Sequence, residues 1–189
     1  MNLDNHTFDK HQEYSDGKYS VYSFSGEKGN FKRLACSQES ICILPFDLNE
    51  HKQIRNVYLT KYKDYLTDSY EVNCLTDTFN TNQFDTHYLA VENSIKEELG
   101  ISNIDIDDIY YLGQVKHTTP FFKEYKCFAL NLTNHLQDQA GWQSPFSEEE
   151  MKGKLKNIEK LKFNKILKGD ISDSLTLSCS LLLLSYFSE

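Results

Sequence analysis

The sequence predicts an α+β protein, built as an α/β/α sandwich around a mixed central sheet. Strand-like segments come in runs, an acidic helix interrupts them near the middle of the chain, and an apolar helical segment closes it. The strands and helices do not alternate as they do in a parallel βαβ fold. The sheet is therefore expected to contain antiparallel as well as parallel pairs.

Length and composition predict a single globular domain. The chain has 189 residues, of which 39% are hydrophobic and 13% aromatic, which is too apolar for a disordered protein. Residues 1–17 are polar and show no periodicity, so they are expected to form an N-terminal arm. Residues 18–189 are expected to form the domain.

Charge and terminal sequence exclude several classes of protein. The formal net charge is -8 and no long run of Lys or Arg is present, so extended nucleic-acid binding is not expected. The N-terminus is polar, unlike a secretory signal, and the apolar run Leu181–Leu184 is far too short to cross a bilayer. The expectation is a cytoplasmic or otherwise intracellular protein that is not secreted and does not bind a membrane.

The five cysteines are scattered along the chain. None of them forms a CxxC motif or a Cys/His cluster with zinc spacing, so the sequence indicates neither a structural metal nor a disulfide framework. Cys42, Cys127 and Cys179 stand in apolar runs and are expected to behave as small buried hydrophobes. This cysteine usage fits a reducing compartment.

Strands are predicted on both sides of the acidic helix. Alternating or continuous apolar segments bounded by turn residues indicate strands over residues 19–25, 31–36, 41–46, 54–62, 70–74, 109–115 and 124–132. Residues 76–83 and 134–146 are expected to be polar loops. Residues 147–168 are expected to be helical, with a capping box at Ser147–Glu150. A last helix is expected to start at Ser172 or Asp173.

The acidic helix is predicted over residues 86–99. Asp85 or Thr86 is the expected N-cap, and Gly100 is expected to end the helix in the left-handed conformation. Helical periodicity places four apolar residues on one buried stripe: Tyr88, Val91, Ile95 and Leu99.

A second face of this helix has the chemistry of a metal site. Ser94, Glu97 and Glu98 are expected to share an exposed face. Two adjacent carboxylates there can hold a hard divalent cation against a phosphate. A third carboxylate is expected at position 94, where the chain has serine.

With this helix placed, the sequence resembles the Nudix hydrolases. Their box contains Gly, five residues, Glu, seven residues, Arg-Glu, an apolar residue, any residue, Glu-Glu, any residue, Gly and an apolar residue. The matching residues are Ile95, Glu97, Glu98, Gly100 and Ile101. The chain departs from the pattern with Asp85 for the upstream Glu, Asn93 for Arg, Ser94 for the first Glu of the cluster, and Phe79 near the box glycine.

The flanking segments resemble the ADP-ribose pyrophosphatase branch of that family. Residues 43–47, 112–115, 127–130 and 169–177 match its strands and closing helix in the right order, and the resemblance covers residues 19–187. Lys61 and Lys63 replace a Gln and an Arg at a strand end in that branch. Glu71 stands where the branch has a glutamate before the box.

The resemblance implies a set of site residues. Glu97 and Glu98 would be the catalytic metal ligands, with Asp85 as an accessory ligand, for Mg²⁺ or Mn²⁺. Lys61, Lys63 and Glu71 would contact the substrate, which in this branch is ADP-ribose or a related nucleoside diphosphate sugar. Asp85 fits equally well as a helix N-cap.

Two functions remain open. The losses within one short motif favour a pseudoenzyme, a non-catalytic binding or assembly module with a protein partner or a second copy, such as a subunit of a virus particle. This function needs no cofactor. The alternative is a working pyrophosphatase that takes its base from Glu148 or Glu149, although a capping box explains those residues too. His87, His117, Phe121, Phe122 and Trp142 are further candidates for ligand or partner contacts.

Overall fold

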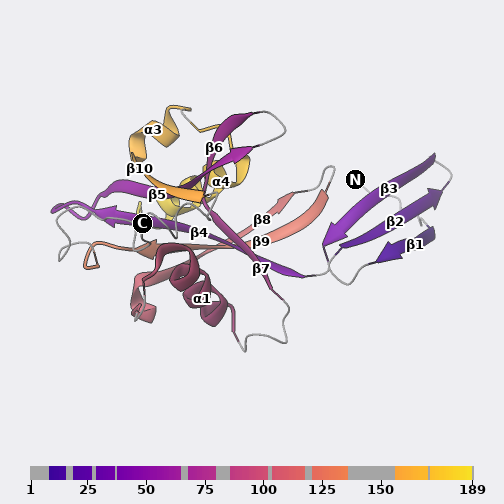
Figure 1. Cartoon of the computed structure of the whole chain (residues 1–189), viewed down its shortest axis with the longest axis horizontal. Helices are drawn as coiled ribbons and strands as arrows, with labels where there is room; N and C mark the ends of the chain where they lie inside the picture. Colours follow the sequence, from indigo (N-terminus) through magenta and orange to yellow (C-terminus); the bar gives the residue numbers. More distant parts are fainter. Residues whose placement is uncertain are drawn as a thin grey trace.

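A computed structural model describes residues 9–15, 19–26, 29–36, 38–64, 68–79, 86–101, 104–117, 121–135, 156–169 and 171–188. Its strands form one mixed sheet, whose central part lies between two helical layers (Figure 1). The helix α1 (His87–Leu99) covers one face, and α3 (Phe163–Leu167) and α4 (Ser174–Tyr186) cover the other. This arrangement confirms the predicted α/β/α sandwich.

The sheet has the order β1-β2-β3-β9-β4-β5-β10, with β6 on β5, β7 on β4 and β8 on β9. The pairs β3–β9 and β4–β9 are parallel and the other pairs are antiparallel, so the sheet is mixed as predicted. A short 3-10 turn, η1 (Ile106–Asp108), precedes β8. The strands are β1 (Asp9–Ser15), β2 (Tyr19–Gly26), β3 (Gly29–Cys36), β4 (Glu39–Leu48), β5 (Ile54–Asp64), β6 (Ser69–Asn73), β7 (Leu75–Phe79), β8 (Ile109–His117), β9 (Phe121–Asn131) and β10 (Lys156–Lys162).

The central strand β4 separates two hydrophobic cores. Successive side chains of a strand point to opposite faces. Ile41 and Ile43 accordingly pack with α1, whereas Cys42, Leu44 and Phe46 pack with α3 and α4. Because helices cover both faces of β4, this strand reads as a continuous apolar run instead of an alternating one.

Three segments differ from the predictions. Residues 9–15, expected in the polar arm, form β1 and pair with β2, where Glu13 also forms an ion pair with Lys32 at 2.7 Å. Residues 75–79, mostly within the expected loop 76–83, form β7 along β4. Residues 156–162, expected to be helical, form β10 along β5. Ile158 and Leu161 pack in opposite cores, which a strand permits, whereas a helix would put residues three apart on one face.

The ends of the long helices confirm the sequence predictions. The Thr86 side chain accepts a hydrogen bond from the Leu89 backbone N–H, and Gly100 ends α1 with φ of 67°. Asp173 caps α4 by accepting from the Thr176 backbone N–H. Within the described residues, no helix is long and apolar enough to span a bilayer.

Candidate functional site

The site is built on α1, which is anchored by its apolar stripe. Val91, Ile95 and Leu99 are buried against the α1 face of the sheet, as predicted. Tyr88, predicted to be buried with them, is 36% exposed because it lies at the edge of the stripe, with its ring against Phe128. The stripe fixes the rotation of the helix and thus the direction of its polar residues.

Ser94 does not lie on the exposed face where the sequence analysis placed it. Its side chain is 2% exposed, and its Oγ donates a hydrogen bond to Asp77 Oδ2 at 2.5 Å. Ser94 is buried because β7, a strand that was not predicted from the sequence, places Asp77 at the border of the apolar stripe. Ser94 therefore belongs to the packed side of α1.

The two box glutamates lie in different surroundings. Glu97 is exposed, and its Oε1 accepts a hydrogen bond at 2.9 Å from the Asn93 side-chain amide. Glu98 is half-buried. The resemblance predicts arginine at position 93, and the chain has the neutral amide of Asn93 there.

The described residues alone do not fit a magnesium site on α1. Among them, one group of at least three His, Cys, Asp or Glu side chains has all its ligand atoms within 4.8 Å of one another. That group consists of cysteines elsewhere in the fold. Glu97 and Glu98 are therefore not part of a group of three such side chains within 4.8 Å of one another among the described residues. Magnesium prefers several hard oxygen ligands in octahedral geometry. Asp85, the proposed accessory ligand, lies outside the described residues.

A polar pocket opens near the start of α1, at the beginning of β4. Its volume is about 330 Å³ and its lining residues are Gln38, Glu39, Ser40, Gln114, Lys123, Glu124 and Lys126. The Oγ of Ser40 is buried and has no hydrogen-bond partner within the described part of the chain. A buried hydroxyl without a partner is uncommon and indicates a place where a ligand or water can bind.

Three charged or titratable side chains meet at the wall of this pocket. Glu39 Oε2 lies 3.1 Å from Lys126 Nζ and in short contact with His87 Nε2. Lys126 Nζ is 2.5 Å from the same His87 nitrogen. Burial alone would raise the pKa of Glu39, but the hydrogen bonds with His87 and Lys126 outweigh it and hold the pKa below its usual value. Glu39 is thus held ionised beside a lysine.

The predicted substrate contacts lie elsewhere on the sheet. Lys61 pairs with Glu159 at 3.0 Å, and Lys63 pairs with Asp68 at 2.6 Å. Alternation along β5 puts both lysines in the row of Val57 and Leu59, which pack toward α3 and α4. This face of the sheet is opposite to the one that carries α1.

Glu71 lies in the other row of this region. It accepts a hydrogen bond from the Tyr62 hydroxyl at 2.8 Å, and burial with this bond raises the pKa of Tyr62 to about 12. Trp142 and Glu148–Glu150 lie outside the described residues, as do the side chains of His117, Phe121 and Phe122. Sequence analysis missed Asp77, Glu39 and Lys126, which no local motif marks, because strand pairing alone brings them to α1.

The sheet, together with α1 on one face and α3 and α4 on the other, has the Nudix fold. It is similar to a crystal structure of ADP compounds hydrolase, with a TM-score of 0.67 and 13% sequence identity over 100% of this chain and 97% of that chain. No protein-family model matches the sequence, and neither does any curated protein. The likeness therefore lies in the fold.

Two further solved structures of similar fold contain bound molecules. The NUDIX domain of NrtR from Shewanella oneidensis, in complex with ADP ribose, has a TM-score of 0.53 and 8% identity over 78% of this chain and 86% of that chain. The C-terminal domain of mouse MUTYH, in complex with human PCNA, has a TM-score of 0.53 and 14% identity over 81% and 91% of the two chains.

Proposed function

We propose that this chain is a non-catalytic Nudix-fold module that acts by binding. The observation that carries the proposal is the hydrogen bond of 2.5 Å from Ser94 to Asp77. It turns the first carboxylate position of the box into a packing contact between helix and sheet. Hydrolysis in this family uses metal ions to polarise a pyrophosphate and activate water.

Three features of α1 support the loss of hydrolysis. Ser94 offers a neutral hydroxyl that is already engaged, and Asn93 supplies no positive charge to orient the box. Glu97 is turned toward Asn93 and solvent. A shared site for metal ions that loses one anionic ligand loses much of its affinity, since each carboxylate offsets the charge of the cation.

The polar pocket supplies a binding site for such a module. Lys123 and Lys126 can contact phosphate oxygens, and the side chains of Gln38 and Gln114 can bind sugar hydroxyls. We assign a nucleoside diphosphate sugar of the ADP-ribose type as the ligand. The NrtR domain bound to ADP ribose has the same fold and supports this assignment.

Assembly with a protein is the second part of the proposal. The strands β1, β2 and β3 form a small sheet that extends away from the sandwich (Figure 1). It offers an edge strand, β1, to a protein partner or to a second copy of the chain. The MUTYH domain in complex with PCNA supports docking of proteins by this fold. A large complex such as a virus particle is the setting we propose, within the cell that makes it.

The test combines binding with turnover. ADP-ribose is titrated into the protein by calorimetry with and without Mn²⁺, and AMP release is then assayed. We expect the wild-type protein to bind ADP-ribose without turnover. The variant Lys126→Ala should bind ADP-ribose at least about tenfold more weakly, because a phosphate contact is lost. The matched control Lys165→Ala changes an exposed lysine of α3 and should bind normally. Metal-dependent AMP release that Glu98→Gln abolishes would overturn the proposal.

One observation favours the alternative, a metal-dependent pyrophosphatase. Asp77 places a carboxylate beside position 94, so a carboxylate is close to where the family motif has one. In that case Glu97, Glu98 and Asp77 would hold Mg²⁺ or Mn²⁺, which would supply Lewis-acid chemistry, with a base from Glu148 or Glu149. Asp77→Asn should then reduce turnover as strongly as Glu98→Gln.

A further inference from the structure

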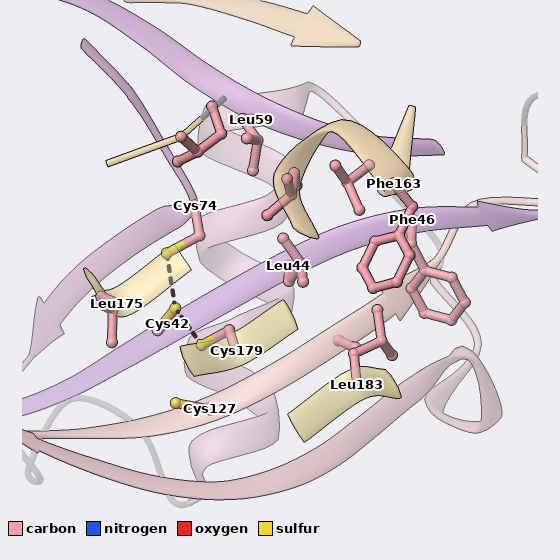
Figure 2. Close-up of a cluster of buried hydrophobic side chains, with 14 residues drawn as sticks. Cys42, Leu44, Phe46, Leu59, Cys74, Cys127, Phe163, Leu175, Cys179 and Leu183 are labelled. Atoms are coloured by element: carbon pink, nitrogen blue, oxygen red, sulfur yellow. Dashed lines mark hydrogen bonds between the residues drawn. The ribbon is translucent and has the colours of Figure 1, made fainter. Parts of the chain in front are cut away.

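Four of the five cysteines meet in the core beneath α4 (Figure 2). Cys42 lies on β4, Cys74 between β6 and β7, Cys127 on β9, and Cys179 on α4. None of these side chains is more than 1% exposed. Cys42 and Cys127 are direct partners in the parallel β4–β9 pair, so their side chains point to the same face of the sheet.

Three of the four sulfur atoms, those of Cys42, Cys74 and Cys179, all lie within 4.8 Å of one another. Cys42 Sγ is 3.0 Å from Cys74 Sγ and 3.1 Å from Cys179 Sγ. Cys127 lies beside these three residues as the strand partner of Cys42, and its thiol donates a hydrogen bond to the Tyr125 carbonyl at 3.8 Å. Even two carbon atoms in ordinary van der Waals contact keep about 3.5–4.0 Å apart. The thiols are therefore closer than inert core side chains need to be.

We infer that Cys42, Cys74, Cys127 and Cys179 form a binding site for one thiophilic divalent metal ion of the zinc type. Zinc takes four ligands in tetrahedral geometry with Zn–S distances of about 2.3 Å, which separates neighbouring sulfurs by about 3.8 Å. To reach that geometry, Cys42 Sγ has to move away from the sulfurs of Cys74 and Cys179 by less than an ångström, and the Cys127 side chain has to turn its sulfur toward them. Rotation about the Cα–Cβ bonds of four short side chains can supply this movement.

The site is carried by rigid elements. Three of its residues lie on or between neighbouring strands, and the fourth is fixed by the burial of α4. Ligands on such elements hold a metal geometry better than ligands on loops. The backbone N–H of Cys74 donates to Thr176 Oγ1 at 2.8 Å, and that hydroxyl donates to Asp173 at 2.6 Å. These bonds orient the Cys74 backbone from the start of α4, as outer contacts do in metal sites.

Binding is an exchange of protons for metal. Four thiols and one Zn²⁺ give a tetrathiolate complex with a net charge of -2 and release four protons, with no change in oxidation state. Affinity should therefore rise with pH, since protons compete with the metal. The ligands are far apart in the chain: Cys74 lies 32 positions after Cys42, and Cys179 lies 137 positions after it. This spacing explains why no zinc motif is visible in the sequence.

The test uses the full chain, reduced and stripped of metal with a chelator. Co²⁺ is titrated in while absorbance is recorded, because tetrahedral cobalt thiolates show intense sulfur-to-metal charge transfer and visible d–d bands. We expect saturation at one ion per chain and displacement of Co²⁺ by Zn²⁺. The variant Cys36→Ala removes the fifth cysteine, on β3, and should keep the bands. The double variant Cys74→Ala/Cys179→Ala should lose them.

The wild-type spectrum alone decides the inference, even if the double variant does not fold. Absence of the charge-transfer band in folded, fully reduced wild type with tenfold excess of Co²⁺ would overturn it. Persistence of the band in a folded double variant would also overturn it. A disulfide at Cys42 in protein kept under reducing conditions would also overturn the inference. Counting free thiols detects such a disulfide. None of these readouts depends on ADP-ribose binding or turnover, so this inference can fail separately from the proposed function.

Discussion

Ser94 on α1 and Asp77 on β7 are joined by a hydrogen bond of 2.5 Å that links the box helix to the sheet. The resemblance to the Nudix box predicts the first glutamate of its cluster at position 94. In this chain the carboxylate comes from the strand and the helix supplies the hydroxyl. The bond thus joins helix and sheet at a position where the resemblance predicts a metal ligand.

Removal of the acceptor in this bond should destabilise the protein. Asp77→Ala leaves the buried hydroxyl of Ser94 without its partner, at a cost of about 1–3 kcal/mol. Urea denaturation measures this loss. Asp77→Asn keeps a side-chain oxygen that can accept the bond, so it should lose less than half as much. Equal stability of Asp77→Ala and wild type would show that the bond contributes nothing.

Exchange of the two groups should return metal binding to α1. The double variant Asp77→Ser/Ser94→Glu moves the carboxylate from the strand to the helix, where it joins Glu97 and Glu98. We expect Mn²⁺ affinity to increase at least about tenfold over wild type, because one more anionic ligand faces the cation. Mn²⁺ titration followed by electron paramagnetic resonance measures the change. A folded double variant with unchanged affinity would mean that a carboxylate at position 94 does not create a metal site with Glu97 and Glu98.

The buried carboxylate of Asp47 should be a major contributor to stability. Its side chain accepts hydrogen bonds from the Tyr58 hydroxyl at 2.6 Å, from the Asn56 amide at 3.0 Å and from Arg55 at 2.8 Å. Asp47→Ala leaves the buried donors of Asn56 and Tyr58 without an acceptor, so we expect a loss of about 3 kcal/mol in the free energy of unfolding. The guanidinium of Arg55 is 55% exposed, and Arg55→Ala should cost less than about 1 kcal/mol. A cost for Arg55→Ala equal to that for Asp47→Ala would contradict this ranking.

The same carboxylate should make the protein sensitive to acid. Burial alone would raise the pKa of Asp47, but hydrogen bonds from Arg55, Tyr58 and Asn56 hold the pKa below its usual value. As the pH falls, Asp47 therefore takes up its proton at a higher pH in the unfolded chain than in the folded protein. The stabilisation is full above the unfolded pKa of about 3.9 and is lost as the pH falls through the folded pKa. Thermal unfolding from pH 6 to pH 2 should show a shallower loss of stability in Asp47→Asn than in wild type.

The N-cap of α4 offers a further test of stability. Asp173 accepts hydrogen bonds from both the backbone N–H and the hydroxyl of Thr176. Asp173→Ala should cost about 1–2 kcal/mol, since the first turn of the helix loses its cap. Ser172→Ala, a change in the exposed neighbour, is the control and should be close to neutral. Chemical denaturation of both variants measures the difference.

Sequence patterns predicted most of the fold because they report local preferences. The apolar run of β4, the Thr86 and Asp173 caps and the Gly100 terminus each depend on residues close together in the chain, and the structure confirms them. The strands β7 and β10 were missed. Their sequences are polar on one side, and pairing with β4 and β5 decides their structure.

The site was less predictable for the same reason. Helical spacing identified Glu97, Glu98 and the unusual Ser94, but not the burial of Ser94, which depends on Asp77 from a separate strand. The contacts of Glu39 with His87 and Lys126, and the close approach of Cys42, Cys74 and Cys179, arise only when distant parts of the chain come together. A single sequence does not reveal which distant strands pair.

The measurement that tests the central claim most directly is calorimetric titration of ADP-ribose into the full chain with Mn²⁺, followed by an assay for AMP release. The account predicts that ADP-ribose binds with the same affinity when Mn²⁺ is left out and that no AMP appears. Release of AMP that requires Mn²⁺ and disappears in Glu98→Gln would contradict it, and would show that α1 is a working active site.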